Sequence, residues 1–163
     1  MLNKNIVLIG MPGCGKTSIG KIVSEKLFLP FYDVDEYLEA KEGKPIKDIF
    51  LKGEAYFREL ESSSIKEIVN NCPSVISTGG GAVKVPRNME ILQKNSIIIF
   101  INRPLEDIIK DIDTSTRPLL LEGQSKLYKL FEERYPLYMQ FNDLEVLNDT
   151  TIEEAADSII KLL

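Results

Sequence analysis

The chain has 163 residues, of which 44% are hydrophobic and 28% charged, and this balance predicts one globular domain spanning residues 1–163. Its net charge of −5 argues against a nucleic-acid partner, and its two cysteines form no disulfide pattern, as expected in a reducing cytoplasm. The absence of histidine excludes a histidine base, a Ser-His-Asp triad and a histidine-ligated metal. We expect neither a signal peptide nor a membrane-spanning segment.

The predicted elements alternate between strands and helices along the chain. Short apolar runs predict strands over residues 5–10, 31–35, 74–78, 96–101 and 144–147. Helical patterns lie before Pro30, over 36–69 with breaks near Gly43 to Pro45 and near Gly53, and over 86–94, from Pro104, 126–141 and 152–163. This alternation predicts an α/β fold with a parallel sheet covered on both faces, whose ligands bind beyond the carboxyl ends of the strands.

A complete P-loop pattern, Gly10-x-x-x-x-Gly15-Lys16-Thr17, follows the first strand. The glycines allow backbone N–H groups to converge on phosphates, and the next helix adds its positive N-terminus. Lys16 would reach the β- and γ-phosphates, and Thr17 would bind Mg²⁺. A glycine-rich turn without a ligand is the alternative, which the filled motif between strand and helix disfavours.

Nucleotide binding alone does not define the reaction. The chain is short for a motor or a GTPase and lacks the Asn-Lys-x-Asp guanine signature. A triple glycine, Gly79-Gly80-Gly81, follows the third strand where many P-loop ATPases carry an acidic residue. These features favour a kinase that acts on a small molecule or a nucleotide.

Two carboxylates, Asp33 and Asp35, end the second predicted strand. Side chains two residues apart on a strand face the same side, so the two carboxylates would lie on one side of the strand, near the P-loop in the predicted fold. One would hold Mg²⁺ through water, and the other would orient or deprotonate an acceptor hydroxyl. The alternative is that Asp35 caps the following helix, a role compatible with ligand binding.

The arginine Arg58 has Glu54 four residues before it and Glu61 three residues after it. This spacing is typical of a surface salt-bridge ladder, worth about 0.3–0.5 kcal/mol per pair. The functional alternative is a guanidinium that Glu61 holds and that binds a carboxylate through its bidentate fork.

Two further segments favour ligand contact. The three successive glycines at 79–81 suggest a close backbone approach to a ligand. The polar segment Asp113–Gln124 resembles a mobile lid, and its Arg117 could close over the phosphates and stabilise charge in the transition state. An exposed loop arginine is the alternative for Arg117.

Taken together, these motifs resemble the shikimate kinase family in order and spacing. The resemblance rests on five features: the P-loop, Asp33-x-Asp35, Gly53-Glu54-x-x-Phe57-Arg58-x-x-Glu61, the triple glycine, and Arg117-Pro118-Leu119-Leu120 with Arg134-x-Pro136-Leu137-Tyr138. Each later motif is weak alone, but all five in register over residues 10–138 are specific. The resemblance implies a three-layer P-loop kinase fold with a five-stranded parallel sheet, a shikimate-binding helical region over about 34–62 and a lid over about 113–124.

The resemblance also implies the reaction and the residue roles. ATP would phosphorylate the 3-hydroxyl of shikimate, with Mg²⁺ as cofactor, in a cytoplasmic monomer that binds neither nucleic acid nor a membrane. The implied catalytic residues are Lys16, Asp35 and Arg117, and the implied metal site is Thr17 with Asp33 through water. The implied ATP-binding residues are Gly13, Cys14, Gly15, Lys16, Thr17, Ser18, Lys110 and Arg117. The implied shikimate-binding residues are Asp35, Arg58, Gly79, Gly80, Gly81 and Arg134.

The sequence departs from the family pattern on the adenine side. Lys110 stands where the family stacks an arginine on adenine, and the loop 148–151 lacks the usual basic residues. We interpret Cys14 as a small space-filling residue rather than a redox switch. The remaining alternatives are a gluconate or nucleoside monophosphate kinase of the same fold, and a catalytically silent ATP-binding module.

Overall fold

A computed structural model describes residues 2–111 and 123–163 of the chain. Its described part contains a five-stranded sheet whose strand order is β2-β3-β1-β4-β5. All the strand pairs are parallel, which confirms the predicted sheet. The strands are β1 (Asn5–Ile9), β2 (Phe31–Asp33), β3 (Val75–Ser77), β4 (Ser96–Asn102) and β5 (Leu144–Leu147).

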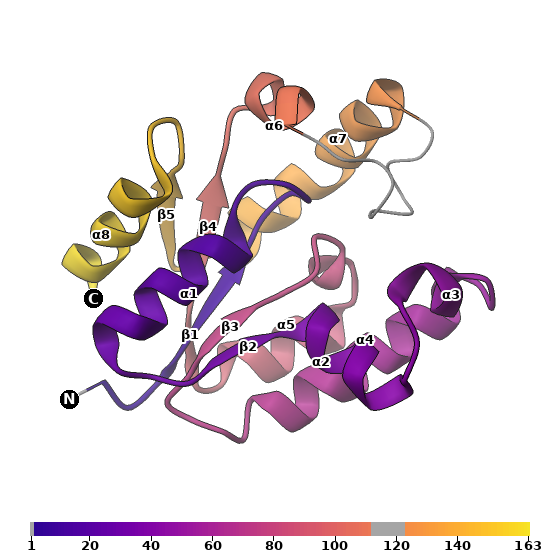
Figure 1. Cartoon of the computed structure of the whole chain (residues 1–163), viewed down its shortest axis with the longest axis horizontal. Coiled ribbons are helices and arrows are strands. Elements are labelled where there is room, and N and C mark those ends of the chain that lie inside the picture. The colour runs from indigo at the N-terminus through magenta and orange to yellow at the C-terminus, as the bar shows by residue number, and fades with distance from the viewer. Residues whose placement is uncertain (1, 112–122) are drawn as a thin grey trace.

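Helices cover both faces of this sheet (Figure 1). They are α1 (Lys16–Leu27), α2 (Val34–Glu42), α3 (Ile46–Phe50), α4 (Glu54–Ile68), the 3₁₀ turn η1 (Ala82–Lys84), α5 (Pro86–Gln93), α6 (Leu105–Asp111), α7 (Gln124–Phe141) and α8 (Ile152–Leu162). α1 packs on α8, whereas α5 and α7 pack on β4 and α4 packs on α5. Right-handed crossovers place these two groups on opposite faces, because the chain leaves β1 in one direction and β3 in the other.

The core explains why β1 can hold the P-loop at the centre of the sheet. All five residues of β1 are buried, because neighbouring strands flank it and helices cover it. A second, smaller core of Leu38, Ile49 and Phe57 joins α2, α3 and α4 into one helical unit beside β2. This unit corresponds to the helical region predicted over about 34–62 and continues to Ile68.

Two predicted boundaries are wrong. The second strand ends at Asp33, not Asp35, because the Asp33 side chain accepts hydrogen bonds from the N–H groups of Asp35 and Glu36 and starts α2. Asp35 therefore lies in the first turn of a helix, and the cap is Asp33 instead of Asp35. The helix predicted from residue 126 begins at Gln124, so the predicted lid, 113–124, overlaps its first residue.

No helix in the described ranges combines the length and the apolar character that crossing a bilayer requires.

Candidate active site

The P-loop connects β1 to α1 through backbone conformations that require glycine. Gly13 and Gly15 have φ angles of 81° and 100°, in the left-handed region that L side chains rarely adopt. At Gly10 a Cβ would lie 2.6 Å from the carbonyl oxygen of Ile101, so the loop also fits tightly against β4. The glycine pattern is therefore explained by the geometry of the loop itself.

Lys16 lies folded back over the P-loop. Its Nζ donates to the carbonyl oxygens of Gly10 and Met11, at 2.7 and 2.9 Å, and lies 3.5 Å from the Cys14 sulfur. The ammonium group is therefore buried inside the curve of the loop that would receive phosphates. Cys14 is fully buried beneath it, as expected for a space-filling residue.

Two side chains that follow β4 and β5 donate hydrogen bonds to backbone carbonyl groups of the P-loop. Arg103, after β4, donates from Nη1 to the carbonyl of Gly13 at 3.0 Å, and Asn148, after β5, donates from Nδ2 to the carbonyl of Cys14 at 2.9 Å. Because the peptide unit is planar and trans, anchoring the Cys14 carbonyl outward turns the N–H of Gly15 to the other side. Sequence reasoning missed this role of Asn148; its place at the carboxyl end of β5 was the available signal.

Oxygen atoms gather where β2 and β3 end beside the start of α1. Thr17 donates from Oγ1 to Asp33 Oδ2 at 2.6 Å, and its Oγ1 lies 3.5 Å from the Ser77 hydroxyl. The structure thus brings together the two residues predicted to hold a metal. Hard oxygen ligands of this kind suit Mg²⁺, which needs few protein ligands when phosphates and waters supply the rest. Ser18, which was predicted to bind ATP, is exposed in the first turn of α1.

The triple glycine packs against the site's own side chains. A Cβ on Gly79 would lie 2.6 Å from Glu61 Oε2 and 3.3 Å from Asp35 Oδ1, and one on Gly81 would lie 2.1 Å from Arg58 Nη2. None of these three glycines has a positive φ angle, so the requirement is space rather than backbone conformation. Gly79 and Gly81 therefore let Asp35, Glu61 and Arg58 converge on one loop.

Arg58 and Arg134 are brought to the same place by α4 and α7. Arg58 Nη1 donates to Glu61 Oε1 at 2.8 Å, and only 1% of Arg134 is exposed. The Nε atoms of both arginines and Nη2 of Arg134 are buried and have no hydrogen-bond acceptor within the described residues. Unused donors on buried cations require an explanation, and an anionic ligand supplies one.

Glu61 is the buried carboxylate between these cations. Burial raises its pKa, while the charges of Arg58 and Arg134 act in the opposite direction. Burial alone would lower the pKa of Arg58, but the Glu61 carboxylate outweighs that effect and raises it. Burial of Glu61 outweighs the two arginines, so its pKa is raised, and the 2.8 Å contact keeps the Arg58 guanidinium charged and oriented.

Tyr138 is a site residue for which the sequence indicated no role. Its hydroxyl donates to the carbonyl of Gly80 at 2.5 Å, and its ring stacks on Phe100 with centroids 5.1 Å apart. Burial raises the pKa of the hydroxyl, so it remains a donor. Tyr138 lies four residues after Arg134 on α7, and helical spacing was the available signal.

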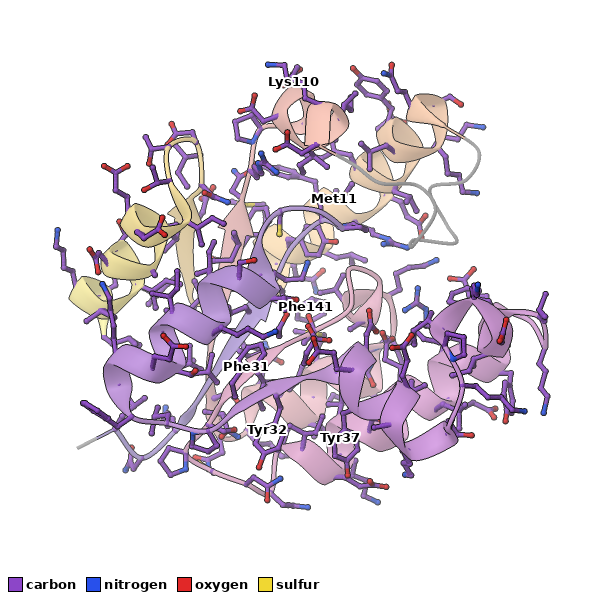
Figure 2. All side chains as sticks on the ribbon, viewed as in Figure 1. Met11, Phe31, Tyr32, Tyr37, Lys110 and Phe141 are labelled. Carbon is purple, nitrogen blue, oxygen red and sulfur yellow. The ribbon has the colours of Figure 1, made fainter. Side chains whose placement is uncertain are left out.

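Two further predicted residues, Arg117 and Lys110, are not brought into the site by the described part of the chain. Arg117 and most of the predicted lid fall outside the described residues. Lys110 lies on α6 at the outer end of the molecule, beyond Met11 of the P-loop (Figure 2). Its side chain is 73% exposed and pairs with Asp107 at 3.3 Å. Lys110 therefore contacts neither the P-loop nor the arginine pair.

In comparisons with known proteins, the family model and the sequence relatives indicate the same family. The family model described as shikimate kinase matches residues 12–163. The chain is 48% identical to a shikimate kinase of Clostridium botulinum strain Alaska E43, over 100% of this chain and 98% of that relative. It is 47% identical to a shikimate kinase of Clostridium beijerinckii, over 100% of this chain and 96% of that relative.

Solved structures agree with this result. The shikimate kinase of Acinetobacter baumannii in complex with shikimate has a TM-score of 0.94 at 32% identity, covering 98% of this chain and 92% of that one. A gluconokinase from Sinorhizobium meliloti has a TM-score of 0.67 at 18% identity, covering 99% of this chain and 94% of that one, and shares the fold alone. The family model and the two relatives each match more than nine-tenths of the sequence, and the chain therefore belongs to the shikimate kinase family.

Proposed function

We propose that the chain transfers the γ-phosphate of ATP to the 3-hydroxyl of shikimate, giving 3-phosphoshikimate and ADP. Family membership supports the reaction type, and the relative from Acinetobacter baumannii was solved with shikimate bound. The gluconokinase similarity concerns the fold and does not favour gluconate as the acceptor.

The observation that carries the proposal is the pair of buried arginines with unused donors. Shikimate has one carboxylate and three hydroxyls, so a guanidinium pair at one end of the pocket would fix its orientation. Arg58 and Arg134 would bind the carboxylate, and Gly79, Gly80 and Gly81 would form the adjacent wall of the pocket. Asp35, whose Oδ1 would lie 3.3 Å from a Cβ on Gly79, would then contact the hydroxyl groups.

On the donor side, the P-loop residues Gly13 to Ser18 would bind the phosphates through backbone N–H groups. Lys16 would exchange its present contacts with Gly10 and Met11 for the β- and γ-phosphates. Burial of this ammonium strengthens its interaction with an anion. Arg117 would add charge stabilisation during transfer, and Lys110 would contribute to adenine binding.

Asp35 would hold the acceptor hydroxyl in line with the γ-phosphate. Positioning supplies most of the catalysis in phosphoryl transfer, so this role does not require full deprotonation by the carboxylate. Its place in the first turn of α2 puts Asp35 near the positive end of the helix dipole.

Thr17 and Asp33 would hold Mg²⁺, directly and through water respectively, using the hydroxyl and the carboxylate that now contact each other. Bound there, Mg²⁺ would neutralise charge on the phosphates during transfer. Asp33 also caps α2, so one carboxylate links the metal position to the helix that carries Asp35. We further propose that the protein acts as a cytoplasmic monomer.

A coupled assay of ADP release tests the proposal. The purified protein is incubated with ATP and Mg²⁺, and shikimate, gluconate or no acceptor is added. We expect acceptor-dependent ADP release with shikimate alone. Release with gluconate instead would indicate another kinase of this fold, and no stimulation by either acceptor would support a silent ATP-binding module.

A further inference from the structure

A lysine bridges the two helices that carry the arginine pair. Lys84 ends the turn η1, three residues after Gly81. Its Nζ lies 2.9 Å from Glu133 Oε1 on α7 and 3.5 Å from Glu54 Oε1 on α4. One ammonium group therefore connects α4, which carries Arg58, to α7, which carries Arg134.

Both ends of this bridge adjoin an arginine. Glu133 immediately precedes Arg134 in α7, and Glu54 Oε1 also accepts from Arg58 Nη2 at 3.3 Å. Glu54 thus shares a single oxygen between Lys84 and Arg58. Burial opposes ionisation of Glu54, but the charges of Lys84 and Arg58 outweigh it and lower the pKa of this carboxyl.

The bridge has two physical consequences. It links α4 to α7 beside the arginines, because the ammonium group lies 3.5 and 2.9 Å from a carboxylate oxygen on each helix. It also competes with Arg58 for Glu54. Without Lys84, Glu54 would pair with Arg58 alone and would neutralise more of the guanidinium edge that a ligand carboxylate needs.

We propose that Lys84 is a positioning residue for acceptor binding, which acts through Glu54 and Glu133 to set the spacing and the free charge of Arg58 and Arg134. This inference deepens the proposed function and rests on it. Partly exposed salt bridges contribute little to folding stability, so we expect the effect in substrate binding rather than in folding.

The first test is the steady-state KM for shikimate at saturating ATP. Lys84→Met should raise this KM about three- to tenfold and leave kcat within about twofold, because a tenfold change needs only about 1.4 kcal/mol. Lys84→Arg, which retains the charge and the donors, should restore a KM within about twofold of the wild-type value.

A second variant separates positioning from simple attraction of an anionic substrate. Glu133→Gln removes a negative charge next to Arg134, so long-range attraction alone would lower the KM for shikimate. Our account predicts a raised KM, because the bridge to α7 is lost. Adding Lys84→Met to Glu133→Gln should then raise KM by less than Lys84→Met does alone, since the connection to α7 is already broken and only the contact with Glu54 remains to be lost. Should Lys84→Met fail to fold, Glu133→Gln alone decides.

The matched control is another salt bridge between two helices. Lys26 on α1 pairs with Asp157 on α8, and both side chains are about half exposed. Lys26→Met should leave the KM for shikimate unchanged. An unchanged KM in Lys84→Met, or a lowered KM in Glu133→Gln, would overturn the inference alone. Absence of shikimate-dependent turnover in the wild type would overturn the proposed function, and this inference with it.

Discussion

At the scale of single residues, the site depends on charged groups that are buried together. Glu61 is fully buried and holds Arg58 at 2.8 Å, while Arg134 lies close enough to influence its ionisation. Such a cluster is expensive to desolvate and is weak evidence for stability. The buried donors of both arginines that have no acceptor instead favour an anion-binding role for this cluster.

Glu61 should make acceptor binding depend on pH. Burial raises its pKa, so Glu61 loses its charge at a higher pH than an ordinary glutamate as the solution is acidified. Above that pKa the carboxylate holds Arg58; below it the charge-assisted contact, worth about 1.5–3 kcal/mol, is lost. We therefore expect the KM for shikimate to rise on acidification, which a KM series over pH would measure.

The control for this effect is Glu61→Gln. This variant should have a KM for shikimate about ten- to a hundredfold higher than the wild type near neutral pH. Its KM should also lose the part of the pH dependence that belongs to Glu61. A wild-type profile that Glu61→Gln reproduces unchanged would show that another group titrates.

Asp35→Asn tests the acceptor side of the mechanism. The substitution keeps the size and the helix position but removes the charge that would orient the hydroxyl. We expect kcat to fall by about 10²–10⁴. Nucleotide affinity, measured by titration calorimetry, should change little, because the proposed phosphate contacts come from the P-loop and Lys16. Turnover close to the wild-type rate would refute the role.

At the scale of elements, the sequence predicted the succession of strands and helices along the chain better than the ends of each element. Apolar β-branched runs predicted the five strands, and the breaks at Gly43 and Gly53 separated α2, α3 and α4 as expected. The start of α2 was misplaced by two residues, since a pattern of residue types does not show which of two aspartates caps the helix.

The site was predictable only where a motif carried it. The P-loop and the pairing of Arg58 with Glu61 followed from spacing, whereas the anchoring of the loop by Asn148 and the contact of Tyr138 with Gly80 depend on tertiary packing. The triple glycine was expected to approach a ligand. Its tight contacts with Arg58 and Glu61 arise from a convergence of elements that no local pattern encodes.

The end of α1 offers a test of local backbone energetics. Phe28 occupies the left-handed position after this helix, with φ 54° and ψ 41°, and is 93% exposed. The left-handed conformation costs a non-glycine residue about 1–2 kcal/mol, partly offset by the roughly 0.5–1 kcal/mol of extra chain entropy that glycine loses. Phe28→Gly should therefore raise the free energy of unfolding by about 0.5–1 kcal/mol.

Leu51 provides the matched control for this change. It is 84% exposed but has an ordinary helical φ of −60°. Leu51→Gly should lower the free energy of unfolding by about 0.5–1 kcal/mol, because only the entropic cost applies. Urea denaturation measures both variants, and equal shifts in the two would show that the backbone conformation of Phe28 is not strained.

At the scale of the whole molecule, the sheet joins two half-sites that are built from different parts of the chain. β1 and β4 carry the P-loop and its anchor Arg103, while α2, α4 and α7 would supply the proposed acceptor residues. Parallel strands direct their carboxyl ends to one edge of the sheet. Under the proposed function, donor and acceptor would therefore meet at this edge.

The central claim is that the protein phosphorylates one particular hydroxyl of shikimate, the 3-hydroxyl. Nuclear magnetic resonance of the product, after incubation with ATP, Mg²⁺ and shikimate, tests it most directly. The account predicts a phosphate ester whose phosphorus couples to the proton on carbon 3. A phosphate on another hydroxyl, or recovery of unmodified shikimate, would contradict it.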